Sequence, residues 1–121
     1  MAVPAIAQVN AGFETGNLTG WAGSGAAVVT SHSTDLGATY TAPEGKFFAR
    51  VEGGCYTKSI SQSFNVTAGQ TITGSAAFDA RDYIPYDDNA RVATVMGAVT
   101  TTLWYQNIYA IGSFADTPWA T

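Results

Sequence analysis

The chain has 121 residues, of which 46% are hydrophobic and 12% are charged, and its formal net charge is −4. A chain of this length suits one domain, and its hydrophobic content suffices for a buried core. Lysine and arginine number only five together, which argues against nucleic acid or an anionic membrane surface as the partner.

The first eight residues, MAVPAIAQ, place small side chains in an Ala-x-Ala arrangement at Ala5 and Ala7. This arrangement is typical of the end of a cleaved export signal, although the basic and long apolar regions of such a signal are missing. We therefore expect residues 1–8 to be a signal-peptide remnant or a tail, and residues 9–121 to form one domain. No apolar stretch reaches the roughly 20 residues that a membrane-spanning helix needs.

Hydrophobic residues alternate with period two along much of the chain, and no segment keeps a helical period over ten or more residues. Ala68-Gly69 and Gly97 are expected to form turns between neighbouring strands. The fold class expected from this pattern is all-β, an antiparallel sandwich or barrel. So few short strands would leave edges unpaired, and such edges invite pairing with another chain. The predicted strands cover residues 26–31, 46–52, 58–66, 70–78, 90–97 and 98–111.

The sequence lacks the residue sets that common catalytic mechanisms need. His32 is the only histidine, and its serine neighbours on a strand end would point to the opposite face, so they cannot complete a hydrolase triad. We expect a loop histidine and a protein that is not an enzyme. Cys55 is the only cysteine and is expected to be small and half-buried, with pairing outside the chain as the alternative.

Residues 79–89, DARDYIPYDDN, form the densest polar segment. Three interpretations remain open for it. In the first, its carboxylates bind calcium, although their spacing differs from that of an EF-hand. Alternatively, Tyr83 and Tyr86 stack on a sugar ring while Asp87 and Asp88 accept hydrogen bonds from its hydroxyl groups. In the third, the segment is a solvated loop with Asx turns and tyrosines packed on the sheet.

A second aromatic group lies in residues 103–109, LWYQNIY. Strand alternation places Trp104, Gln106 and Ile108 on one face and the remaining residues on the other. One face is expected to join the core, and the other offers a ligand platform or a subunit contact. Trp104 therefore joins the candidate stacking groups.

Residues 10–21, NAGFETGNLTGW, and residues 43–54, PEGKFFARVEGG, resemble the first strands of galactose-binding-like jelly-roll domains. Residues 61–90 are similar to the middle of such domains. This family includes carbohydrate-binding modules of bacterial secreted and surface-anchored proteins. The resemblance implies a jelly-roll sandwich in which Phe13 and Trp21 anchor the beginning of the domain. In the family two further strands usually follow a motif like the final one here, so the domain is expected to be incomplete or completed by a neighbour.

The same resemblance implies a structural calcium ion bound by the carboxylate of Glu14 and by main-chain carbonyl groups around Gly45 and Lys46. Calcium takes about six to eight oxygen ligands, and the family's acidic residue near the C-terminal strand has no counterpart here. The alternative is that Glu14 caps a turn or faces solvent.

Together these observations favour a secreted, non-catalytic β-sandwich that binds carbohydrate or a surface glycan. The alternative is a structural subunit of an extracellular or cell-surface assembly, in which copies of the chain join through strand pairing. The expected partners are therefore carbohydrate or other copies of the chain, at the cell surface or outside the cell.

Overall fold

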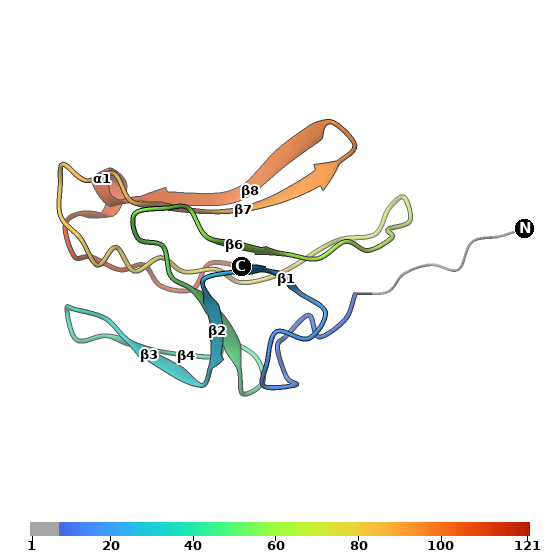
Figure 1. Cartoon of the computed structure of the whole chain (residues 1–121), viewed down its shortest axis with the longest axis horizontal. Helices are drawn as coiled ribbons and strands as arrows, with labels where there is room; N and C mark the ends of the chain where they lie inside the picture. Colours follow the sequence, from blue (N-terminus) through green and yellow to red (C-terminus); the bar gives the residue numbers. More distant parts are fainter. Residues whose placement is uncertain (1–7) are drawn as a thin grey trace, which may run out of the picture. The chain divides into compact units, whose positions relative to one another are not determined.

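The computed structural model describes residues 8–121, and strands make up nearly all of its regular structure (Figure 1). The only helix in this part of the chain is one turn, α1 (Ile108–Ile111). The expectation of an all-β chain is confirmed. The strands are β1 (Ala22–Ser24), β2 (Ala26–Val29), β3 (Ser31–Ser33), β4 (Thr39–Thr41), β5 (Phe48–Val51), β6 (Ser59–Ser61), β7 (Asn89–Met96) and β8 (Val99–Asn107).

The strands of residues 8–121 pair in twos, as β1–β6, β2–β5, β3–β4 and β7–β8. The three pairs with an assigned register, β1–β6, β2–β5 and β7–β8, run antiparallel. The chain divides into two compact units. The N-terminal unit comprises the residues up to His32 together with Tyr40–Ile72, and the C-terminal unit comprises Ser33–Thr39 and Thr73–Thr121.

In the N-terminal unit, one bent segment supplies both β1 and β2, and the bend lies at Gly25, which has a φ of 73°. Before the bend the chain pairs with β6, and after it with β5. Gly23 lies opposite Ile60 in β6. A Cβ atom at Gly23 would collide with the carbonyl oxygen of Ser59, so this close approach of two backbones requires glycine.

In the C-terminal unit, β7 and β8 form one long hairpin around the two-residue turn Gly97-Ala98. Gly97 has a φ of 59°, as the first position of a type II′ turn requires. The turn expected at Gly97 is thus confirmed. The register shifts between Val92 and Ala93, where Leu103 is the extra residue on β8.

The core of the C-terminal unit lies at the base of this hairpin. Its buried residues are Phe78, Ala80 and Ile108, and Ile108 is fully buried. Residues Ala90, Trp104 and Ile111 pack against them. Antiparallel bridges Ala76–Ala120 and Asp79–Asp116 join the end of the chain to the segment before the hairpin.

Of two neighbouring predicted strands, one is shorter in the structure and the other is absent. The strand expected over 58–66 ends at Ser61. The side chain of Gln62, the next residue, donates to the carbonyl oxygens of Val9 and Gly20, at 2.7 and 2.9 Å. Residues 70–78 form no strand and contribute a single isolated bridge, at Ala76. Alternation marks two faces, but a strand also needs a partner for its backbone groups.

Other local expectations have mixed outcomes. The turn at Ala68-Gly69 is confirmed by the hydrogen bond from the Gln70 amide to the Thr67 carbonyl, 3.0 Å. The loop position of His32 is wrong, because His32 lies on β3 and stacks on Tyr40 across the β3–β4 hairpin. Cys55 was expected to be half-buried and is exposed, since it lies in a loop outside the strands.

Candidate functional site

Four exposed aromatic side chains gather in the loops at the base of the β7–β8 hairpin, and we call them the aromatic cluster. The ring of Tyr83 meets Tyr86 edge to face, with centroids 5.3 Å apart, and lies 5.9 Å from the ring of Phe114. Tyr109 donates its hydroxyl hydrogen to the carbonyl oxygen of Pro85 at 3.1 Å. The exposed fractions are 48% for Tyr83, 55% for Tyr86, 53% for Tyr109 and 39% for Phe114.

Backbone hydrogen bonds hold the two halves of this cluster together. The amide of Phe114 donates to the carbonyl oxygen of Asp82 at 2.7 Å, and the amide of Ile84 donates to Oγ of Ser113 at 3.0 Å. A turn closed by the Tyr86 amide and the Tyr83 carbonyl, 3.0 Å apart, sets the spacing of the two tyrosines. The loop that follows Asp82 is therefore braced by the segment that follows α1.

Two carboxylate residues follow the aromatic residues in the same loop. Asp87 and Asp88 directly follow Tyr86 and are exposed. Partial burial of the Asp88 carboxyl group, and then the negative charges of Asp82 and Asp87, raise its pKa. The same loop therefore carries exposed aromatic rings and hydrogen-bond acceptors. In residues 8–121, no group of three or more His, Cys, Asp or Glu side chains is arranged to hold a metal ion.

The structure brings four of the five predicted ligand-binding residues into one loop, namely Tyr83, Tyr86, Asp87 and Asp88. It places Trp104 apart from them, packed against the buried core of the C-terminal unit. The expectation that one face of residues 103–109 joins the core is confirmed by Trp104 and Ile108, the latter with 0% exposure.

The period-two pattern misses two members of the aromatic cluster, Tyr109 and Phe114, because it extends the last strand to residue 111. The strand ends at Asn107, whose side chain caps α1 by accepting a hydrogen bond from the Ala110 amide at 2.9 Å. An asparagine followed by Gly112 five residues later is a helix start and stop signal. That signal separates the helical turn from the strand.

The predicted calcium residues Glu14 and Lys46 lie together in the N-terminal unit. Oε1 of Glu14 accepts hydrogen bonds from the amides of Lys46 at 3.0 Å and Phe47 at 3.2 Å, and Oε2 lies 3.2 Å from the Lys46 amide. Gly45 has a φ of 70°, and a Cβ atom there would collide with the Glu14 carboxylate. Glu14 thus accepts hydrogen bonds from the N–H groups of Lys46 and Phe47, and it fastens two loops together.

Hydrogen bonds of Asn10 join the ends of the opening motif, residues 10–21. The Asn10 side chain donates to the carbonyl oxygen of Asn17 at 2.9 Å and accepts from the Thr15 amide at 3.1 Å. The indole Nε1 of Trp21 donates to the Asn10 carbonyl at 3.0 Å. Phe13 and Trp21 stack with centroids 5.1 Å apart, and both are partly buried. The two aromatic residues therefore anchor this turn-rich segment, but neither belongs to the buried core that was expected to hold them.

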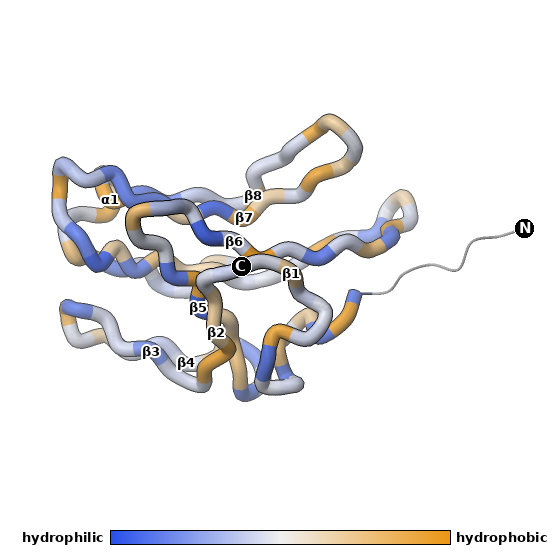
Figure 2. Tube along the Cα trace, in the orientation of Figure 1, coloured by the Kyte–Doolittle hydropathy of each residue, from blue (hydrophilic) through white to orange (hydrophobic). Residues whose placement is uncertain are grey.

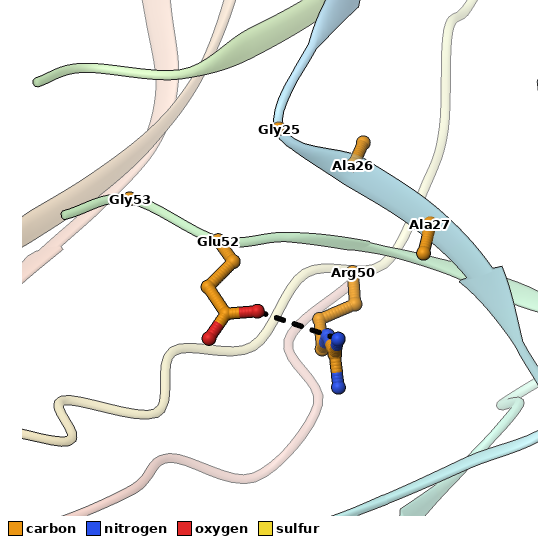
Figure 3. A pocket seen from close by; sticks show the side chains of 6 residues that line it. All are labelled: Gly25, Ala26, Ala27, Arg50, Glu52 and Gly53. Carbon is orange, nitrogen blue, oxygen red and sulfur yellow. Dashed lines mark ion pairs between the residues drawn. The ribbon is translucent and has the colours of Figure 1, made fainter.

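A shallow hollow lies beside the β2–β5 pair of the N-terminal unit (Figure 3). Arg50 and Glu52 form an ion pair across it at 3.3 Å. Its volume is about 390 Å³, but it has no aromatic wall, and its two charged groups pair with each other. It is therefore a weaker candidate than the aromatic cluster. The lining residues are Gly25, Ala26, Ala27, Arg50, Glu52 and Gly53.

Comparisons with protein-family models, with curated proteins and with solved structures found no match for this chain. Within residues 8–121, no helix is both long enough and apolar enough to cross a bilayer.

Proposed function

We propose that the chain is a secreted, non-catalytic carbohydrate-binding domain with a galactose-binding-like jelly-roll sandwich. The observation that carries this function is the aromatic cluster, in which exposed rings of Tyr83 and Tyr86 lie next to Asp87 and Asp88. The fold is proposed from the opening motif and its resemblance to that family. A role outside the cell agrees with the low content of charged residues.

In this function, the apolar face of a sugar ring stacks on Tyr86 or Tyr83. The carboxylates of Asp87 and Asp88 accept hydrogen bonds from sugar hydroxyl groups, since neither carboxylate accepts a hydrogen bond within residues 8–121. Charged acceptors form the stronger class of hydrogen bond. Tyr109 and Phe114 support the two stacking tyrosines through Pro85 and Tyr83.

The test is a glycan array probed with the unmodified chain and with Tyr83→Ala and Tyr86→Ala. Loss of one stacking ring is expected to weaken binding about tenfold or more. Tyr56→Ala is the matched control, because Tyr56 is 78% exposed and belongs to the N-terminal unit. Glycan binding that both cluster variants retain, or that Tyr56→Ala weakens equally, contradicts the proposal.

A structural calcium ion at Glu14 and the carbonyl group of Lys46 is a second part of the proposal. Within residues 8–121, Oε2 of Glu14 accepts one hydrogen bond, from Lys46, which leaves a lone pair for a cation. A bound ion stabilises the native state, so a chelator should lower the melting temperature of the unmodified chain and leave that of Glu14→Gln unchanged. A melting temperature that the chelator does not shift in either chain excludes this ion.

A further inference from the structure

The outer edge of β8 has no partner in the part of the chain that the structure describes. β8 spans nine residues, VTTTLWYQN, without a charged residue, a proline or a glycine. Its only neighbour in a sheet is β7. Backbone groups alternate between the two sides of an antiparallel strand, and Val99 pairs with Met96 next to the turn. Thr100 and Thr102 therefore direct their N–H and C=O groups away from β7.

Hydrophobic residues gather around the turn of the hairpin (Figure 2), and their side chains are exposed. Core contacts reach the hairpin only at its base, through Ala90 and Trp104. Natural proteins blunt such edges with lysine, proline or a covering segment, and a long uncharged edge is a site for pairing. The exposed fractions are 68% for Val95, 67% for Met96, 64% for Val99 and 54% for Leu103.

The distribution of charge selects a partner strand and its direction. Asp82, Asp87 and Asp88 lie at the base of the hairpin, and the strand β8 itself carries no charge. A second copy of β8 therefore meets no like charge along the edge. In an antiparallel pair the two acidic bases lie at opposite ends, whereas in a parallel pair they would lie together and repel each other.

We propose that β8 pairs antiparallel with β8 of a second copy of this chain, around a two-fold axis at Thr101. In this register Thr100 lies opposite Thr102 of the second copy, so that the outward backbone groups of both strands meet. Val99 lies opposite Leu103 of the second copy, and Thr–Thr and apolar cross-strand pairs both stabilise a sheet. The product is a four-stranded sheet in the order β7–β8–β8–β7, and it does not depend on carbohydrate binding.

The experiment is sedimentation of the full chain in a dilution series, with two threonine-to-lysine variants. Thr101→Lys places two ammonium groups opposite each other on the two-fold axis, and it is expected to raise the dimer dissociation constant about tenfold or more. Thr94→Lys is the matched control, because Thr94 pairs with Thr101 from β7 and lies one strand away from the proposed contact. The unmodified chain and Thr94→Lys should form dimers.

Three outcomes overturn the proposal: an unmodified chain that is monomeric throughout, equal loss of the dimer in both variants, or a dimer that Thr101→Lys leaves intact. Equal loss would assign the contact to the face of the hairpin instead of its edge. Amide exchange supplies a measurement without a substitution. The amides of Thr100 and Thr102 should exchange more slowly as the protein concentration rises, and rates that do not depend on concentration also overturn the proposal.

Discussion

Glu14 shows how a single side chain obtains its role from the loop that it meets. In the sequence it is a lone carboxylate between Phe13 and a run of polar and glycine residues. In the structure it accepts hydrogen bonds from two consecutive amides, those of Lys46 and Phe47. The absence of a side chain at Gly45 makes room for the carboxylate.

We predict that Glu14→Gln lowers the free energy of unfolding by about 1 kcal/mol, because a neutral amide replaces a charged acceptor of backbone hydrogen bonds. Denaturant titration measures the change. Glu44→Gln is the control, since Glu44 is exposed, lies in the same loop as Lys46, and makes no ion pair or side-chain hydrogen bond with the residues that the structure describes. Equal losses in the two variants would show that the Glu14 contacts do not stabilise the fold.

The raised pKa of Asp88 predicts how stability depends on pH. Partial burial and the charges of Asp82 and Asp87 place the pKa of the folded state above the ordinary value of 3.8. The folded chain therefore binds the Asp88 proton more tightly than the unfolded chain does. The resulting stabilisation is fully present below pH 3.8 and is lost as the pH rises through the folded-state pKa.

Asp88→Asn should therefore be more stable than the unmodified chain at neutral pH, with a difference that shrinks as the pH falls below the folded-state pKa. Denaturant titrations at neutral and acidic pH measure both differences. A gain in stability that is the same at both pH values would assign it to a cause other than the charge. Asn retains the backbone, so the hydrogen bond from the Ile108 amide to the carbonyl oxygen at position 88 should persist.

At the scale of elements, partners decide where strands begin and end. β7 agrees closely with the predicted segment 90–97, because a type II′ turn joins it to β8 and their ladder satisfies the inner backbone groups of both strands. The predicted segment 98–111 is too long, because β8 ends at Asn107 and α1 follows it. β6 is much shorter than its alternating segment, because it pairs with the three residues of β1. The short strands β3 and β4 lack a period-two pattern long enough to predict them.

The helical turn α1 is an element that holds the aromatic cluster together. Asn107 accepts a hydrogen bond from the Ala110 amide at 2.9 Å, and removal of such a cap commonly costs about 1 kcal/mol. We predict this loss for Asn107→Ala in thermal unfolding. Asn89→Ala is the matched control, because Asn89 lies opposite Asn107 in the β7–β8 pair. It should cost less stability, because within residues 8–121 the Asn89 side chain makes one long hydrogen bond, to the Asp87 carbonyl at 3.4 Å. The reverse order of stability would contradict the cap.

At the scale of the whole molecule, the two proposals together predict an effect of avidity. A dimer paired through β8 carries two aromatic clusters, so it should bind an immobilised multivalent glycan more tightly than a monomer does. Thr101→Lys should weaken binding to that surface and leave binding of a soluble monovalent sugar unchanged. Surface binding and calorimetry measure the two affinities. A proportional loss in both would show that the substitution damages the sugar site itself.

The sequence by itself determined the features that depend on neighbours in the chain. Period-two alternation and the shortage of helix formers indicate an all-β chain, and Ala68-Gly69 and Gly97 mark turns because glycine accepts positive φ. Only the tertiary structure decided which side chains meet across long separations. It placed Phe114 against Tyr83, Trp104 in the core and the Lys46 amide on Glu14. The physical reason is that alternation assigns a residue to a face, whereas the return path of the backbone decides what covers that face.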